Sequence, residues 1–174
     1  MLKRFILPAA LALAAGGAWA QQPAAQPSQP ANSAQPQQLT KEQQEFRARM
    51  AKNAQGITES VDQGNVAALW DQSSDVMKQA VTRDAFVSGV QGERAKLGKM
   101  VSRQLVRMYR ITSKGENKLP AGNYLNVLFA TRFANDQQPM AELVSYHFDK
   151  DNVVRLSGYT VQKPTPAKQA SNGH

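Results

Sequence analysis

Histidine and aspartate stand close together in "HFDKD", and these residue types can transfer protons or bind a metal ion. The group consists of His147, Asp149 and Asp151. However, "DKDN" is typical of a tight turn, and it lacks the glycine and the glutamate of a calcium-binding loop. We therefore predict a strand histidine followed by a solvated hairpin tip, with no catalytic residue, no metal site and no cofactor.

Several other chemistries are excluded because the necessary residues are missing. The chain has no cysteine, which excludes disulfides, thiolate metal sites and thiol nucleophiles. It has no G-x-S-x-G turn for a serine nucleophile, and Gly89, Gly92 and Gly98 lack the spacing and the Lys-Ser/Thr ending of a phosphate-binding loop. A non-enzymatic protein is therefore favoured. The alternative is a small-ligand-binding enzyme with a pocket between sheet and helices.

Positive charge gathers in residues 94–118. This segment holds eight basic residues and one acidic residue, for a net charge of +7, whereas the whole chain carries +8. Nucleic acid is not an expected partner, because aromatic residues that could stack on bases are missing from the segment apart from Tyr109. An anionic envelope component or a protein partner is more accessible to an exported protein. Three bases are the predicted binding residues: Arg103, Arg107 and Arg110.

The basic segment fits two conformations. As a helix, five of its bases would lie within one arc of about 80°, at 100° per residue: Lys99, Arg103, Arg107, Arg110 and Lys114. As a strand, Arg103 would share a face with Lys99 and Arg107, whereas Arg110 and Lys114 would lie on the opposite face. A glycine at the start and the turn-rich "ITSKGENKLPAG" at the end favour the strand only slightly. Both interpretations stay open on these residues alone.

A polar face of the predicted sheet supplies three more candidate binding residues: Tyr124, Arg132 and Tyr146. Ordinary cross-strand pairing, such as Arg132 with Glu142, accounts for the same polar positions and is the favoured interpretation.

The segments that would position these residues are helical first and extended afterwards. In residues 40–97, Thr40 and Gln43 have the capping-box spacing of a helix start. "LNVLFATRF" and "MAELVSYHF" alternate as strands do. This order predicts a single α+β domain over residues 40–162, with N-terminal helices packed on an antiparallel sheet. The stripe of the first helix consists of Phe46, Met50, Ala54, Ile57 and Val61.

The two ends of the chain differ in composition from the domain. Residues 1–20 have a basic start, a short apolar core and an A-x-A pattern before a cleavage site between Ala20 and Gln21. We therefore expect a Gram-negative type of export signal, a periplasmic protein and no membrane span after cleavage. Residues 21–39, rich in Gln, Pro and Ala, are expected to be a disordered linker, and residues 163–174 a disordered tail.

Several short motifs resemble an exported bacterial family known as domain of unknown function 4019. They are "VAALWDQSS", "LGKMVSR", "LPAGNYLNVLFATRF" and "VVRLSGY", in that order and with Glu142 between the last two. The resemblance covers roughly residues 45–162. It implies a nuclear-transport-factor-two-like (cystatin-like) fold, in which helices pack into the curve of an antiparallel sheet of about four strands.

The resemblance also decides between the two interpretations of the basic segment. In the implied layout residues 100–112 are the first long strand, so the strand is expected. Arg103 matches the family's pattern, so an ion pair at the start of this strand competes with a binding role for it. The expected protein is a non-enzymatic binding or interaction module, either a monomer or a homodimer.

Overall fold

A computed structural model of the chain describes residues 38–116 and 119–164. The predicted export signal with its Ala20–Gln21 cleavage site lies outside the described residues. The same holds for the predicted linker up to residue 37 and for the predicted tail from residue 165.

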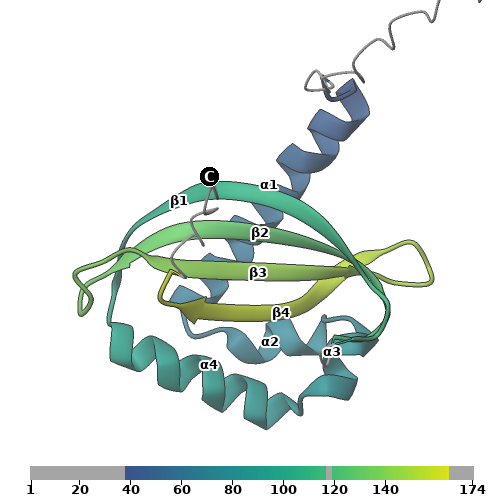
Figure 1. Ribbon diagram of the computed structural model, residues 1–174. Helices are drawn as coiled ribbons and strands as arrows, with labels where there is room; N and C mark the ends of the chain where they lie inside the picture. Colours follow the sequence, from purple (N-terminus) through teal and green to yellow (C-terminus); the bar gives the residue numbers. More distant parts are fainter. Residues whose placement is uncertain (1–37, 117–118, 165–174) are drawn as a thin grey trace, which may run out of the picture. The chain divides into compact units, whose positions relative to one another are not determined.

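Four helices are followed by four strands in the described residues (Figure 1). They are α1 (Lys41–Asp62), α2 (Val66–Asp71), α3 (Asp75–Ala80), α4 (Arg83–Leu97), β1 (Met100–Ser113), β2 (Gly122–Phe133), β3 (Met140–Phe148) and β4 (Val154–Gln162). The predicted α+β class, with helices before a four-stranded antiparallel sheet, is confirmed. None of the helices in this part of the chain combines the length and the apolar character that a membrane crossing requires.

Side-chain caps begin three of the helices. At the start of α1, the Thr40 hydroxyl accepts from the Gln43 amide and the Gln43 side chain accepts from the Thr40 amide, which is the predicted capping box. At the starts of α3 and α4, the hydroxyls of Ser74 and Thr82 accept from the Met77 and Ala85 amides. These contacts satisfy amides that have no partner within the helix. The predicted stripe of α1 is buried at Met50, Ala54, Ile57 and Val61.

The strands form a meander in the order β1-β2-β3-β4, each antiparallel to the next. β1 pairs with β2 along its whole length, from Met100 opposite Phe133 to Ser113 opposite Gly122. Residues 100–113 of the basic segment are therefore a strand, because their backbone groups on one side bond to β2 and not along a helix.

The predicted faces of this strand are wrong. Leu105 pairs with Phe129 and Arg107 with Leu128, so Val106 is an extra residue on β1 and forms a bulge. One extra residue moves every later side chain to the other face. Arg103 and Arg110 therefore lie on the same face, and Arg107 lies on the opposite one.

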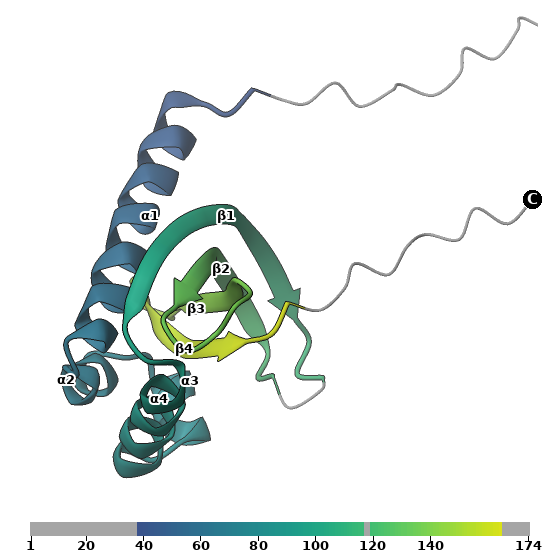
Figure 2. The same cartoon turned by 90° about the vertical axis from the view of Figure 1, so that its left-hand side faces the viewer.

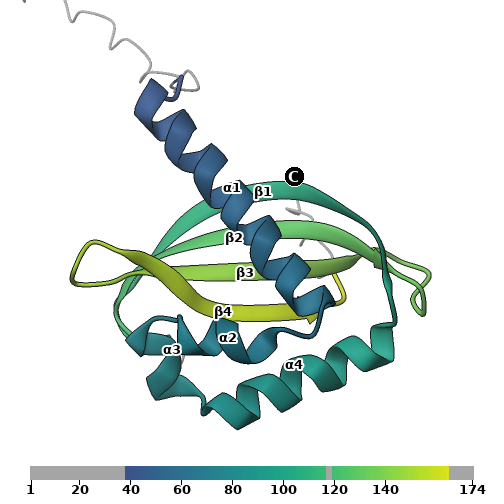
Figure 3. The same ribbon diagram turned by 180° about the vertical axis from the view of Figure 1, so that it is seen from behind.

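The helices cover one face of the sheet, which we call the inner face. Figure 3 shows α1 crossing the strands on this face, and Figure 2 shows α1 beside the sheet with α3 and α4 below β4. In Figure 1 the opposite, outer face is towards the viewer, and no described helix covers it. The apolar core lies between α1 and the inner face and includes Ala54, Ile57, Val127, Phe129, Val144 and Leu156.

At the start of β2, the backbone comes very close to a side chain of β3. Gly122 has a φ of +154°, and a Cβ added there would overlap Nε2 of His147. The imidazole cannot move away freely, because it packs edge-on against Tyr124 with 4.9 Å between ring centroids. The position therefore requires a glycine.

We expect Gly122→Ala to lower the free energy of unfolding by about 1–3 kcal/mol, the usual effect of overpacking a filled site. The loss should be smaller in a His147→Ala background, since the overlap is with the imidazole. Urea unfolding followed by circular dichroism measures both effects.

Gly56→Ala is the matched control. Gly56 lies within α1, and nothing lies within 4 Å of an added Cβ. This change should raise the free energy of unfolding by about 0.5–1 kcal/mol, because alanine is the better helix former. Equal effects of the two glycine substitutions would contradict the close packing at Gly122.

Candidate functional site

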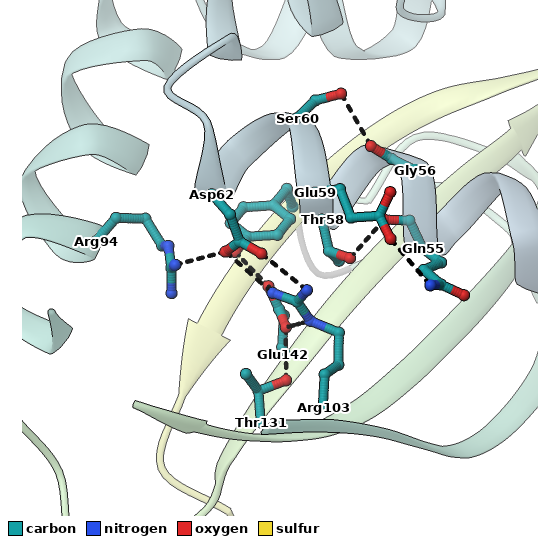
Figure 4. A network of polar contacts seen from close by, with 11 residues as sticks. Gln55, Gly56, Thr58, Glu59, Ser60, Asp62, Arg94, Arg103, Thr131 and Glu142 are labelled. Atoms are coloured by element: carbon teal, nitrogen blue, oxygen red, sulfur yellow. Dashed lines mark hydrogen bonds and ion pairs between the residues drawn. The ribbon is translucent and has the colours of Figure 1, made fainter. Parts of the chain in front are cut away.

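A fully buried carboxylate lies at the centre of a polar network on the inner face (Figure 4). Glu142 of β3 is 0% exposed. It accepts from Arg103 Nε at 2.6 Å and Nη2 at 3.1 Å, from the Thr131 hydroxyl at 2.6 Å and from the Tyr159 hydroxyl at 2.6 Å. Residues of all four strands therefore meet at this one side chain.

A second carboxylate completes the network from the helix side. Asp62, the last residue of α1, accepts from Arg103 Nη1 at 2.9 Å and Nη2 at 3.1 Å, and from Arg94 Nη2 of α4 at 2.6 Å. Arg103 thus contacts two carboxylates with one planar guanidinium. We call this network the buried ion cluster; it consists of Asp62, Arg94, Arg103, Thr131, Glu142 and Tyr159.

Arg94 is the member whose hydrogen bonds are incomplete. Its guanidinium lies over the ring of Phe133, 4.2 Å from the centroid, and its Nε and Nη1 are buried without a hydrogen-bond partner among the described residues. The positive charge is nevertheless opposed by Asp62. The cluster therefore holds two cations and two carboxylates.

The buried ion cluster suits a structural role better than acid–base chemistry. Burial alone would lower the pKa of Arg103, but hydrogen bonds to Asp62 and Glu142 outweigh it and raise that pKa. Burial, and then the charge of Glu142, raise the pKa of the Tyr159 hydroxyl. Because Glu142 already accepts four hydrogen bonds, it has no free position for a substrate proton.

A second polar group surrounds His147. A cavity of about 660 Å³ is lined by Ser73, Asp75, Val76, Lys78, Gln79, Pro120, Ala121, His147, Asp149, Lys150, Asp151 and Arg155. His147 Nδ1 lies 2.7 Å from Asp149 Oδ1, and Arg155 binds Asp149 at 2.9 Å and Asp151 at 2.8 Å. The hydrogen bond from Arg155, followed by one from the Val153 amide, lowers the pKa of Asp151 to about 2.

The other imidazole nitrogen of His147, Nε2, is not accessible from this cavity. His147 Nε2 is buried without a hydrogen-bond partner in the part of the chain that the structure describes and faces the backbone of Gly122. Asp149 and Asp151 belong to the turn between β3 and β4 and are engaged by Arg155. In the described residues no group of His, Asp and Glu side chains has an arrangement that could hold a metal ion.

A third feature is a groove of about 440 Å³ between α1 and β1, which we call the edge groove. Tyr109 and Arg110 of β1 line it beside the edge that does not pair with β2, and Leu125 of β2 lines it from the inner face. The Arg110 guanidinium lies over Phe46 and Phe148, 5.3 and 4.9 Å from the ring centroids. The lining residues are Leu39, Glu42, Gln43, Phe46, Arg47, Tyr109, Arg110 and Leu125.

The four predicted arginines are found in three different environments. Arg103 lies in the buried ion cluster, and Arg110 lies in the edge groove. Arg107 is exposed on the outer face, where it lies over Tyr109 at 4.7 Å. Arg132 is exposed on the outer face of β2, whereas Glu142 faces inward, so the predicted pair of Arg132 with Glu142 is wrong.

The two predicted tyrosines are buried. Tyr124 is 2% exposed and donates to the Pro120 carbonyl at 2.9 Å. Tyr146 is 1% exposed and donates to Asn53 Oδ1 of α1 at 2.7 Å. Burial raises the pKa of both hydroxyls. Each hydroxyl therefore anchors another segment of the fold.

Sequence reasoning missed Asp62 and Arg94 in the cluster, and Phe46 and Arg47 in the groove. One signal was available, because Glu142 occupies an inward position of the alternating strand "MAELVSYHF". A carboxylate among inward apolar residues requires a buried cation. The sequence could not show which cation, since Arg103 is 39 residues away.

The geometry describes an α+β domain in which helices and strands are joined by a buried ion cluster. Comparison with family models places the chain in a family described as "Protein of unknown function (DUF4019)", matched over residues 53–159. The match covers more than half of the chain, and the chain belongs to this family. No match was found among curated proteins or among solved structures.

Arg103→Met should lower the free energy of unfolding by about 3–5 kcal/mol, because Glu142 would stay buried without its cation. The control is Arg83→Met, which removes the surface pair of Arg83 with Asp71 and should change stability little. Chemical unfolding measures both. Similar losses in the two variants would show that the buried ion cluster contributes no more than a surface pair.

Stability should also fall as the pH rises above about 10. Burial raises the folded-state pKa of Tyr146 and Tyr159 above the ordinary 10.0. Above that pH the unfolded chain binds fewer protons than the folded chain, so deprotonation favours unfolding. Phenolate absorbance and circular dichroism should change together, and Tyr146→Phe should weaken the effect. Ionisation of these tyrosines with an unchanged native spectrum would contradict this.

Proposed function

We propose that this protein is an exported, periplasmic and non-enzymatic binding module that takes anionic envelope partners through cations of β1. Export is supported by the signal pattern ending at Ala20. A nuclear-transport-factor-two-like fold is part of the proposal, and it is supported by the family's motifs and by the meander sheet with helices on one face.

The observation that carries the proposal is a difference among the cations of one segment. Arg94 and Arg103 are neutralised in the buried ion cluster. By contrast, four cations of the same segment form no ion pair within the described residues: Lys99, Arg107, Arg110 and Lys114. Unopposed surface cations attract anionic partners and speed their association.

An enzyme with its pocket beside His147 is the alternative function. The cavity of about 660 Å³ and the contact of His147 with Asp149 favour it. A general base must reach the proton that it removes. Because Nε2 faces Gly122 and Nδ1 is engaged by Asp149, binding is the function that the geometry supports better.

Salt-dependent retention on heparin tests the proposal. The purified protein should be retained at low salt and elute as the sodium chloride concentration rises. Its unpaired cations displace counterions from heparin, and added salt opposes this displacement. Arg107→Glu/Arg110→Glu should elute at clearly lower salt. Arg103 is left unchanged, since its substitution would disturb the buried ion cluster.

Lys52→Glu/Lys163→Glu is the matched control. Both lysines are exposed, Lys52 in α1 and Lys163 just after β4, and the double variant has the same change in net charge. It should elute close to the unmodified protein. The proposal is wrong if the unmodified protein is not retained at low salt, or if the two double variants lose retention equally.

A further inference from the structure

The edge of β1 that faces away from β2 has no neighbouring strand among the described residues. β1 has 14 residues, and at about 3.3 Å per residue it is a long edge. Five of the seven exposed large apolar residues in the described part of the chain belong to it: Met100, Val101, Leu105, Val106 and Ile111. A long, apolar and unpaired edge is a template for another extended chain.

The backbone orientation identifies the groups available on this edge. The Met108 carbonyl accepts from Arg47 Nη1 at 3.5 Å, so it points towards α1 and away from β2. Amide and carbonyl groups of alternate residues in an antiparallel strand point the same way. Arg110 and Thr112 therefore also present their backbone groups to the free edge. This stretch lies beyond the bulge at Val106, where pairing with β2 is regular.

The edge groove adjoins this regular stretch. Tyr109 and Arg110 line it from β1, Phe46 and Arg47 line it from α1, and Leu39 lines it just before α1. An extended segment here would have backbone partners on β1 and side-chain contacts on α1. The groove therefore offers both features that strand addition uses, namely main-chain hydrogen bonds and side-chain pockets.

Charge indicates what kind of segment fits. A second copy of β1 would place Arg107 and Arg110 close to the same residues of its partner, and like charges on adjacent strands are destabilising. Edge cations also prevent self-pairing in natural sheets. A segment with carboxylates would instead neutralise Arg47 and Arg110, which have no ion pair within the described residues.

We infer that the edge groove binds an extended, carboxylate-rich segment of a partner protein, which adds to β1 as a fifth strand. The inference rests on the proposed function and names the class of partner. The segment's backbone bonds to the free edge at Met108, Arg110 and Thr112. Its carboxylates point to the inner face and meet Arg47 and Arg110, and its alternate apolar side chains point to the outer face beside Tyr109 and Ile111.

The test uses a synthetic peptide of about eight residues in which glutamate alternates with valine, with both ends blocked. Two further peptides carry N-methyl groups on one or the other alternate set of amides. Strand addition uses one set and leaves the other in solvent. The unmodified peptide should bind saturably. The peptide methylated on the amides that face β1 should bind about tenfold or more weakly. The peptide methylated on the other amides should bind nearly as well as the unmodified peptide.

Protein variants locate the peptide. Arg47→Glu/Arg110→Glu should abolish binding, whereas Lys52→Glu/Lys163→Glu should retain it. Circular dichroism and thermal unfolding establish that each variant is folded. Protection of the β1 amides from hydrogen exchange on peptide addition gives a second readout that does not depend on charge.

The outcomes separate this inference from the proposed function. Salt-sensitive heparin retention without saturable peptide binding up to about 1 mM overturns strand addition and leaves the polyanion-binding function in place. Equal binding of both methylated peptides also overturns it, because the contact would then be purely electrostatic. A homodimer joined through β1 in ultracentrifugation would show that a second copy occupies the edge. Absence of heparin retention overturns the proposed function itself.

Discussion

The structure depends on neutralising one fully buried carboxylate. Glu142 is fully buried on the inner face of the sheet, where an isolated charge would be strongly unfavourable. Arg103 supplies the opposite charge, and its remaining donors bind Asp62 at the end of α1. Because Asp62 also binds Arg94 of α4, the need to satisfy a single side chain joins two helices to the sheet. Removing one partner of such a buried pair is strongly destabilising, because the other charge stays buried without compensation.

The same constraint divides the basic segment into two parts with different roles. Arg103 lies ahead of the bulge at Val106 and is used inside the fold. Arg107 and Arg110 lie beyond the bulge, on opposite faces, and have no ion pair within the described residues. A net charge counted along the sequence treats these three residues as equivalent. Burial and pairing show that Arg107 and Arg110 are available to a partner, whereas Arg103 is not.

Features set by neighbouring residues were predictable, whereas features set by distant contacts were not. The capping box at Thr40 and the stripe of α1 depend on spacings of a few residues, and both were predicted correctly. No residue pattern in the sequence marks the bulge at Val106, so Arg103 and Arg107 were wrongly assigned to the same face of the strand. Asp62 and Glu142 are 80 residues apart in the sequence, and no local pattern relates them.

The buried ion cluster also determines where the edge groove lies. It holds the C-terminal end of α1 against β1 and β3 through Asp62, and α1 runs from there across the inner face (Figure 3). Phe46 lies 16 residues earlier on this helix, about 24 Å away at 1.5 Å per residue. At that distance it meets Arg110 and Phe148 and forms one wall of the edge groove. The interaction that removes Arg103 from the accessible surface thus places α1 so that Arg110 and Arg47 lie together beside the unpaired edge of β1.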